Sequence, residues 1–177
     1  NNKIVGENTD VFGLQAAYLK EITDGESKKA LVIGAGGVSS SVIFSLQRSK
    51  INNISIVNRT HEKSIFLKKK FIFLNILEWK SLQHELPKFD IIINATSLGL
   101  KKEDEIELDY KKIGSNKLFY DVIYNPKETN FLKKGKLNGN QTENGKMMFI
   151  YQAHQAFILW HKKSPKIDDE TIKLLDQ

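Results

Sequence analysis

The sequence predicts one α/β domain with a doubly wound parallel sheet, and three observations support this fold class. Apolar, strand-like runs alternate with helix-like segments along the chain. The run DIIINA at 90–95 has no polar alternation, as expected of a parallel strand covered on both faces. A glycine-rich turn joins the first strand to a helix in the stretch IGAGGVSSSV at 33–42.

The elements can be placed in chain order. A mostly buried helix is expected at 8–22, with Thr9 or Asp10 as its cap. Strands are expected at 30–33, 53–58, 90–95 and 117–124, and an apolar segment lies at 71–77. Helices are expected at 37–48, 61–70, 128–136, 146–161 and 168–175. Because ligands of such sheets bind beyond the carboxyl ends of the strands, residues at these ends are the candidates for function.

The composition limits the class of protein. The 177 residues are 40% hydrophobic, which is enough for one domain with a core. The absence of cysteine excludes disulfides and thiolate metal sites, and the four scattered histidines predict no metal. No apolar run is long enough for a bilayer and no signal peptide precedes the first strand, so we expect a cytoplasmic protein without membrane contact. The chain begins with Asn1 rather than methionine, so we expect a fragment or a processed piece.

The net charge of +6 raises the question of nucleic-acid binding. Of the 27 basic residues 25 are lysine, however, and they are spread along the chain without interleaved aromatic residues. A lysine-rich composition explains this charge better than a nucleic-acid site does, so no nucleic-acid partner is expected.

The glycine-rich turn predicts a Rossmann-type phosphate site. Gly34 would make the tight turn after the strand, and Gly36 would let the backbone approach a pyrophosphate. The stretch GAGGVS ends in Ser39 rather than glycine, but a small residue still permits close packing of helix on strand. The cofactor-binding candidates here are Gly34, Ala35, Gly36, Gly37 and Val38. A structural turn without a ligand is the alternative.

The end of the second strand indicates which dinucleotide would bind. An NAD site usually has an acidic residue there for the ribose 2′-hydroxyl, whereas this sequence reads NRTHEK at 58–63. Arg59 is one of only two arginines in the chain, and a guanidinium matches a phosphate group bidentately. The candidates Asn58, Arg59, Thr60 and Lys63 therefore favour NADP. A solvated turn at the strand end is the alternative.

Four further positions carry weaker signals. Thr96 and Ser97, in INATSLGL at 93–100, follow a strand and could line a nicotinamide pocket, although such residues are ordinary in loops. Asp10 begins a helix, and by itself it is explained better as an N-cap than as a functional residue. Gln152 lies on an aromatic-rich helix whose apolar residues are explained by core packing.

Taken in order, these segments resemble the shikimate dehydrogenase family over essentially the whole chain. The resembling segments are ENTD at 7–10, VIGAGGVSSSV at 32–42, NRTHEK at 58–63, INATSLG at 93–99, YDVIYNPKET at 120–129, NGKMMFIYQA at 144–153 and FILWH at 157–161. The departures are few: Val11 stands where the family often has glycine, and Lys63 where arginine is common.

The resemblance implies specific roles. It implies that Asp10 is a catalytic and substrate-binding residue paired with a lysine, and that Tyr124 and Gln152 contact the substrate. It also implies that Val122 and Gly145 border the nicotinamide end of NADP. Residues 1–177 would form the NADP-binding domain, with a bridging helix region at 1–22 and C-terminal helices at 146–177. No segment matches the family's N-terminal domain, which supplies that lysine.

The activity implied by the resemblance is the NADP-dependent, reversible reduction of 3-dehydroshikimate to shikimate, in aromatic amino acid biosynthesis. The chain alone is expected to bind NADP without turnover. Two alternatives stay open: a quinate/shikimate dehydrogenase that accepts NAD, and a cofactor-binding module without activity. The expected partners are small molecules, and a homodimer is an open question.

Overall fold

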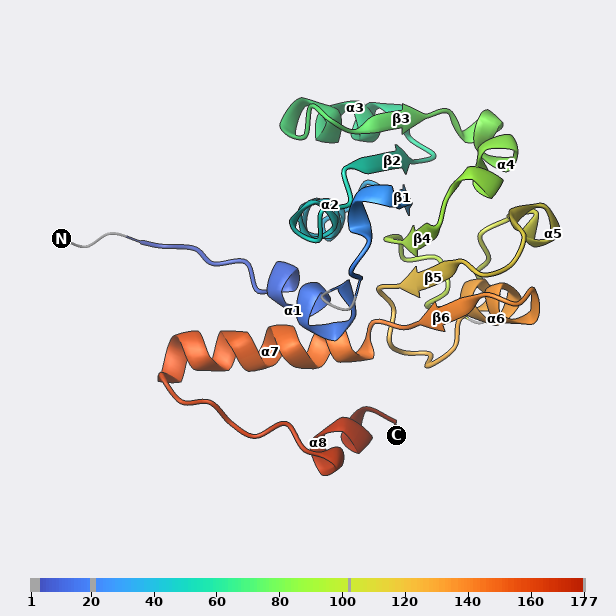
Figure 1. The fold of residues 1–177 in the computed structure, drawn as a ribbon. Coiled ribbons are helices and arrows are strands. Elements are labelled where there is room, and N and C mark those ends of the chain that lie inside the picture. The colour runs from blue at the N-terminus through green and yellow to red at the C-terminus, as the bar shows by residue number, and fades with distance from the viewer. Residues whose placement is uncertain (1–3, 20–21, 102, 177) are drawn as a thin grey trace.

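The fold is one all-parallel, six-stranded sheet in the order β3-β2-β1-β4-β5-β6 (Figure 1). The computed structural model describes residues 4–19, 22–101 and 103–176. The strands are β1 (Lys29–Ile33), β2 (Asn53–Val57), β3 (Asn75–Leu77), β4 (Ile91–Asn94), β5 (Leu118–Asp121) and β6 (Gln141–Glu143). The predicted doubly wound parallel fold class is confirmed.

Helices cover both faces of the sheet (Figure 1). One face packs against α1 (Asp10–Ala17), α2 (Ser39–Arg48), α3 (His61–Lys70) and α7 (Lys146–His161). The other face packs against α4 (Leu82–Glu85), α5 (Tyr110–Ile113) and α6 (Asn130–Leu137), and α8 (Asp169–Lys173) follows α7. Two separate apolar cores result, and β4, in which all four residues are buried, contributes to both. The apolar sequence of this strand follows from its place between two layers of helices.

Some elements differ from the sequence-based expectation. β6 was not expected, because its three residues QTE are polar and only partly buried at the edge of the sheet. The predicted strand at 117–124 ends at Asp121, so Val122 and Tyr124 lie in the loop beyond it. The apolar segment at 71–77 contributes only the three residues of β3 as a strand. The short helices α4 and α5 carry too few residues for a helical pattern to be visible.

The first helix is shorter and differently capped than expected. It ends at Ala17 rather than at residue 22, and part of the predicted remainder, residues 20 and 21, lies outside the described residues. Thr9 is the N-cap by position, but its side chain caps no backbone amide. Instead the Oδ1 atom of Asn8 accepts hydrogen bonds from the backbone amides of Asp10 at 3.0 Å and Val11 at 3.4 Å. Thr9, one of the two predicted cap residues, is thus the N-cap, but the capping hydrogen bonds are made by Asn8, which was not predicted.

The helices α1 and α7 cross closely at a glycine. A Cβ atom on Gly13 would lie 2.5 Å from the carbonyl oxygen of Met148 and 2.9 Å from the Cβ of Gln152. Because both contacts are on the α7 backbone or next to it, a side chain would push the helices apart. The expectation that α1 is mostly buried holds for Gly13 and Leu14, whereas Phe12 is 42% exposed.

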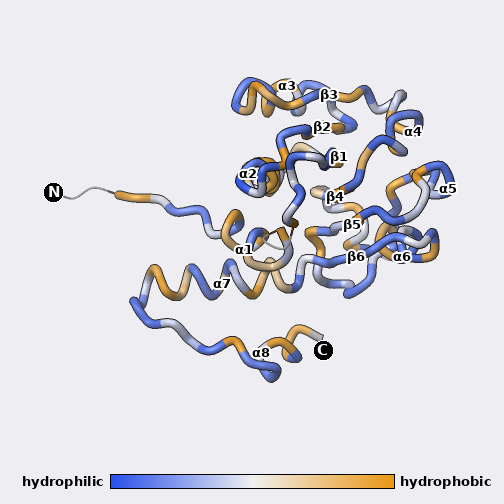
Figure 2. The backbone as a smooth tube through the Cα atoms, viewed as in Figure 1, coloured by the Kyte–Doolittle hydropathy of each residue, from blue (hydrophilic) through white to orange (hydrophobic). Residues whose placement is uncertain are grey.

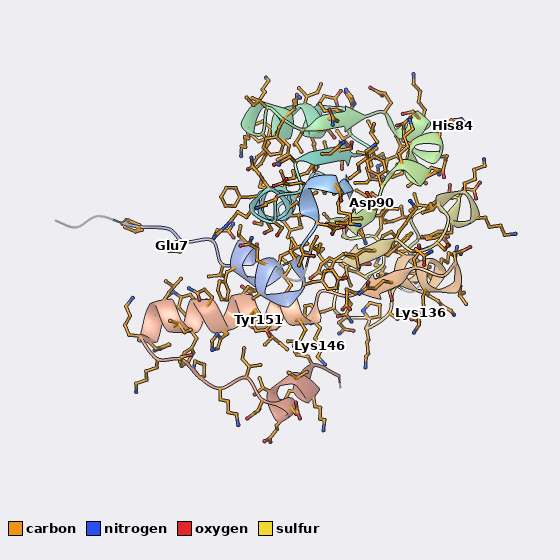
Figure 3. The ribbon with its side chains drawn as sticks, viewed as in Figure 1. Glu7, His84, Asp90, Lys136, Lys146 and Tyr151 are labelled. Atoms are coloured by element: carbon orange, nitrogen blue, oxygen red, sulfur yellow. The ribbon has the colours of Figure 1, made fainter. Side chains whose placement is uncertain are left out.

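The chain before α1 runs away from the sheet as an extended segment that carries Glu7 (Figure 3). Figure 2 shows hydrophobic residues on this segment, and Ile4 and Val5 are 98% and 68% exposed. Among the described residues, no helix is long and apolar enough to cross a membrane.

Candidate functional site

The sheet reverses its strand order beside β1. From β1 the chain adds β2 and β3 on one side, then returns to add β4, β5 and β6 on the other. In open parallel sheets, ligands bind beyond the carboxyl ends of the strands at such a switch point. Most of the predicted site residues lie in the loops after β1, β2, β4 and β5. The fold therefore brings them together at the carboxyl ends of the strands.

Gly34 makes the turn after β1 for reasons internal to the fold. Its φ angle is +111°, a conformation that residues with a side chain rarely adopt. A Cβ atom would also lie 2.7 Å from the Cγ2 of Thr96 and 2.8 Å from the carbonyl oxygen of Ala95. The backbone here is fixed by the amide of Gly34, which donates to the carbonyl of Val57 at 2.8 Å. The first glycine of the motif is therefore a structural requirement.

Gly36 and Gly37 are different, because the fold itself does not require glycine at either position. Neither has a positive φ angle. A Cβ on Gly36 would meet only the Ala95 carbonyl oxygen, at 3.9 Å, and a Cβ on Gly37 would meet nothing within 4 Å. The protein thus leaves open space above these two residues. Glycine at both positions would let a ligand lie directly against the backbone.

The same loop presents hydrogen-bond donors. Within the described part of the chain, the backbone amides of Gly36, Gly37 and Val38 have no acceptor. They directly precede α2, a helix of ten residues whose N-terminus carries partial positive charge. Free amides, a helix N-terminus and open space together fit a phosphate or pyrophosphate group.

Asn58 joins the glycine-rich loop to the end of β2. Its Oδ1 accepts a hydrogen bond from the amide of Ala35 at 3.1 Å, and its Nδ2 donates to the carbonyl of Thr60 at 2.8 Å. Two predicted cofactor-binding residues, Ala35 and Asn58, are thus bonded to each other. This hydrogen bond fixes the loop next to Gly36, Gly37 and Val38, whose amides are free to bind a ligand.

The basic residues after β2 face solvent. Arg59, Thr60 and Lys63 are exposed, and among the described residues the side chain of Arg59 has no partner. His61 lies between them and pairs with Glu78, with 3.4 Å between Nδ1 and Oε1. The guanidinium group is therefore available to an incoming anion.

The loop after β4 is held by the side chain of Asn94. Its Oδ1 accepts hydrogen bonds from the amide of Thr96 at 3.0 Å and from the Thr96 hydroxyl at 2.7 Å. Its Nδ2 donates to the carbonyl of Leu98 at 3.0 Å. The predicted nicotinamide-side residues Thr96 and Ser97 lie on this loop, and Ser97 is exposed.

A buried carboxyl group lies beside it at the end of β5. Asp121 is fully buried and pairs in register with Asn94, whose Nδ2 donates to Asp121 Oδ1 at 3.0 Å. The Thr129 hydroxyl donates to Asp121 Oδ2 at 2.7 Å, and the amide of Ile123 donates to Oδ1 at 3.0 Å. Burial raises the pKa of Asp121 to about 6, against the three hydrogen bonds, which lower the pKa.

Sequence reasoning did not select Asn94, Asp121 or Thr129. Each lies in a segment that carries the family resemblance, INATSLG or YDVIYNPKET, but their mutual contacts join positions far apart in the chain. One feature of the sequence could have indicated them: two apolar strands each end in a residue whose side chain can form hydrogen bonds, Asn94 in one and Asp121 in the other.

The loop after β5 packs on the start of α7. A Cβ on Gly145 would lie 2.0 Å from the carbonyl oxygen of Val122, so only glycine fits there. The Tyr124 ring stacks on Phe149 of α7, with 4.6 Å between ring centroids and 25° between planes. Val122, Tyr124 and Gly145 are thus brought together at the carboxyl end of β5.

The predicted substrate residues Asp10 and Gln152 lie at the crossing of α1 and α7. The Thr9 hydroxyl donates to Gln152 Oε1 at 3.2 Å, and Asn8 Nδ2 donates to Ser41 Oγ of α2 at 3.0 Å. These bonds tie the ENTD segment to both helices. Asp10 is half-buried, and in the part of the chain that the structure describes its carboxylate has no bonded partner.

The described residues contain no group of three or more His, Cys, Asp or Glu that could hold a metal ion. The groups that the site does present are the hydrogen-bond donors of the strand-end loops and the carboxylate of Asp10.

Comparisons with known proteins point to one family. The model of the shikimate / quinate 5-dehydrogenase family matches residues 17–130. A shikimate dehydrogenase (NADP(+)) of Pelagibacter ubique is 54% identical over 176 residues, which cover 99% of this chain and 65% of that protein. The chain thus spans about 65% of the length of this curated relative.

Two solved structures share the fold. A shikimate dehydrogenase of Aquifex aeolicus has a TM-score of 0.83 at 33% identity, over 96% of this chain and 61% of that one. A shikimate 5-dehydrogenase of Thermus thermophilus, in complex with NADP(H) and shikimate, has a TM-score of 0.79 at 27% identity, over 96% of this chain and 62% of that one.

Proposed function

Because the chain belongs to the shikimate/quinate 5-dehydrogenase family, we propose that it supplies the NADP-binding domain of an enzyme that reversibly reduces 3-dehydroshikimate to shikimate. The observation that carries the cofactor assignment is the open space above Gly36 and Gly37, beside the unpartnered amides that precede α2. The names of the Pelagibacter ubique and Thermus thermophilus relatives, which include NADP(+) or NADP(H), support it independently.

The 2′-phosphate of NADP would bind Arg59. This side chain is exposed at the end of β2, beside Thr60 and Lys63, where an NAD-binding domain usually has an acidic residue. A free guanidinium group can form a bidentate, charge-assisted pair with a phosphate group. Asn58 would serve by holding the glycine-rich loop in place, through the hydrogen bond that its Oδ1 accepts from the Ala35 amide.

The nicotinamide half would extend over β4 and β5. A dinucleotide that crosses the switch point places its two halves on opposite sides of β1, and Arg59 marks the adenosine side. Thr96, Ser97, Val122 and Gly145 lie on the other side, at the ends of β4 and β5. When bound, the nicotinamide supplies or accepts the hydride that the substrate carbon gains or loses.

The substrate would lie between the strand ends and the α1–α7 crossing. Gln152 and Tyr124 would orient the substrate ring, and their existing partners, Thr9 and Phe149, hold them in place. Asp10 would accept a hydrogen bond from the reacting hydroxyl or from the lysine that handles its proton, and so fix the path of that proton. Orientation of the substrate by these residues accelerates the reaction fully only when Asp10 and the lysine are both present.

A cofactor-binding module without turnover is the second candidate. The features that carry the cofactor assignment, the open space above Gly36 and Gly37 and the free amides before α2, would serve such a module equally. Both candidates require NADP binding, and they differ in whether the protein as made in the cell oxidises shikimate.

Calorimetric titration of the 177-residue chain with NADP+ and with NAD+ tests the cofactor assignment. We expect NADP+ to bind distinctly more tightly. Equal affinities would contradict the NADP proposal. Assay of the whole gene product with shikimate and NADP+ then separates the two candidates, because only the enzyme produces a steady rise in nicotinamide absorbance.

A further inference from the structure

The buried carboxyl group of Asp121 is not explained by the proposed cofactor contacts. It is fully buried, and no lysine or arginine in the described ranges is among the groups that move its pKa. Isolated carboxylates are costly to bury, and unless something requires the charge, an apolar or amide side chain is the more stable choice. Yet the surroundings of Asp121 consist of hydrogen-bond donors, which favour its ionised form.

Each of these donors belongs to a different part of the site. Asn94 Nδ2 comes from β4, and the same side chain holds the loop that carries Thr96 and Ser97. The Ile123 amide belongs to the loop between Val122 and Tyr124. Thr129 is the N-cap of α6, where its Oγ1 also accepts the Leu132 amide at 3.3 Å. One carboxylate thus joins two strand-end loops and a helix.

The loop after β4 contacts the same cap directly. A Cβ on Gly99, whose φ angle is +115°, would lie 3.0 Å from the Cγ2 of Thr129. The loop therefore packs against Thr129 with no room between them. A shift of the Thr129 hydroxyl on loss of its acceptor would be transmitted to this loop.

On the basis of this network and of the proposed function, we propose that Asp121 is a positioning residue. In its ionised form it fixes the loops after β4 and β5 in the arrangement that receives the nicotinamide half of NADP. Protonation at Oδ2 removes the acceptor of the Thr129 hydroxyl and loosens the packing of Thr129 on the loop after β4, whereas the bonds that Oδ1 accepts from Asn94 and Ile123 remain. The adenosine half, which rests on the loops after β1 and β2, is unaffected.

The pH at which this happens is set by the surroundings of Asp121. Its pKa is raised to about 6 by burial. Among the residues that the structure describes, two titratable side chains interact with Asp121: the phenols of Tyr110 in α5 and Tyr120 in β5. Burial is the main cause that raises the pKa of each phenol, and the charge of Asp121 raises it by a smaller amount. Glu105 acts on Tyr110, and Glu143 on Tyr120, in the same direction. Both phenols stay neutral at ordinary pH, so Asp121 is the group of this cluster that changes charge near pH 6.

The test compares two ligands that differ only in the nicotinamide group: NADP+ and 2′-phospho-ADP-ribose. Both carry the same 2′-phosphate and pyrophosphate, so titration of the 2′-phosphate affects them equally. Calorimetric affinities of the 177-residue chain are measured from about pH 5 to about pH 8. We expect the ratio of the two affinities, NADP+ over 2′-phospho-ADP-ribose, to fall about tenfold as the pH drops through about 6.

Variants separate positioning from general damage. Asp121→Asn is expected to give the low ratio at every pH, since it cannot ionise. Thr129→Val should lower the ratio, and Thr129→Ser, which keeps the hydroxyl, should restore it. Asp109→Asn is the matched control, because Asp109 is a carboxyl that caps the short helix α5 outside this network. It should keep the normal pH dependence.

The outcomes distinguish the inference from the proposed function. If both ligands bind and their ratio is independent of pH in the unmodified chain, the positioning role is wrong while the NADP assignment stands. If Asp121→Asn weakens both ligands equally, its role is merely structural and the inference is likewise overturned. If neither ligand binds, the proposed function fails and this inference fails with it.

Discussion

The backbone amide of Ala35 donates a hydrogen bond to the side-chain Oδ1 of Asn58 at 3.1 Å, across 23 residues of sequence. This bond joins the loop after β1 to the loop after β2, and the Nδ2 of Asn58 extends the link to the Thr60 carbonyl. The two halves of the adenosine side are thereby held in one geometry. Loss of the link should disturb pyrophosphate binding without touching the 2′-phosphate contact.

Asn58→Ala is therefore expected to weaken NADP+ and NAD+ binding by the same factor, about three- to tenfold, the effect of one or two ordinary hydrogen bonds. Calorimetric titration with both cofactors measures it. A selective loss of NADP+ binding would show instead that Asn58 contacts the 2′-phosphate directly.

Arg59→Ala should remove most of the preference for NADP+ over NAD+. A charge-assisted hydrogen bond contributes about 1.5–3 kcal/mol, so NADP+ affinity should fall roughly ten- to a hundredfold and NAD+ affinity should hardly change. Arg48→Ala is the matched control, because the only other arginine lies in the last turn of α2, at the end away from the glycine-rich loop. An equal effect of both substitutions would point to net charge rather than to a specific contact.

Two glycine substitutions in one loop should have opposite effects. Gly36→Val meets little within the protein, so it should abolish cofactor binding while the melting temperature changes little. Gly34→Ala should instead destabilise the fold by about 1–2 kcal/mol or more, because of the φ angle of +111° and the contact with Thr96. Thermal unfolding and titration of both variants check this. Intact binding in Gly36→Val would mean that no ligand lies against that residue.

Asp10→Asn is expected to lower kcat of the whole enzyme by about 10²–10⁴ and to leave NADP+ affinity nearly unchanged. The carboxylate lies at the start of α1 and belongs to none of the strand-end loops that would hold the cofactor, so cofactor contacts should stay intact. Steady-state kinetics with shikimate and a separate cofactor titration provide the two readings. A large loss of cofactor affinity would show that Asp10 contributes to cofactor binding, in contradiction to the proposed role.

The 177-residue chain by itself should bind NADP+ yet not reduce it with shikimate. The proposed catalytic carboxylate is present, but no lysine in this sequence matches its partner in the family, and positioning of the substrate is lost with it. Absorbance at the nicotinamide band, with bound cofactor verified by titration, decides the point. Steady turnover by this chain would show that the catalytic groups are misassigned.

The stability of the chain should depend on pH through Asp121. Its pKa rises from an ordinary value of 3.8 to about 6 in the folded state, so the folded protein binds the proton more tightly than the unfolded chain. This contribution to stability is fully present below pH 3.8 and is lost as the pH rises through about 6. At about 1.4 kcal/mol per pH unit, the change is on the order of 2–3 kcal/mol.

Asp121→Asn removes this dependence. Urea unfolding at about pH 4.5 and about pH 8 should therefore show the variant gaining stability relative to the unmodified chain at the higher pH. Parallel pH dependence of the two proteins would contradict a raised pKa. Since ionisation lowers stability here, retention of the carboxyl is consistent with a functional need for its charge.

The sequence by itself determined the fold class and predicted where a cofactor would bind. Uniformly apolar strands such as β4 need helices on both faces, which requires a parallel, doubly wound sheet. The order strand, glycine-rich turn, helix predicted a phosphate site, and Arg59 at the next strand end favoured NADP. These features depend on local pattern, so the sequence was enough to find them.

Only the tertiary structure showed which contacts each candidate residue makes. Gly34 and Gly36 look alike in the sequence, but contacts from the end of β4 separate a structural glycine from one that leaves room for a ligand. The edge strand β6 has no apolar pattern, because pairing with β5 rather than burial makes it a strand. The partners of Asp121 come from β4 and the cap of α6, and no spacing along the chain predicts contacts that the register of the sheet creates.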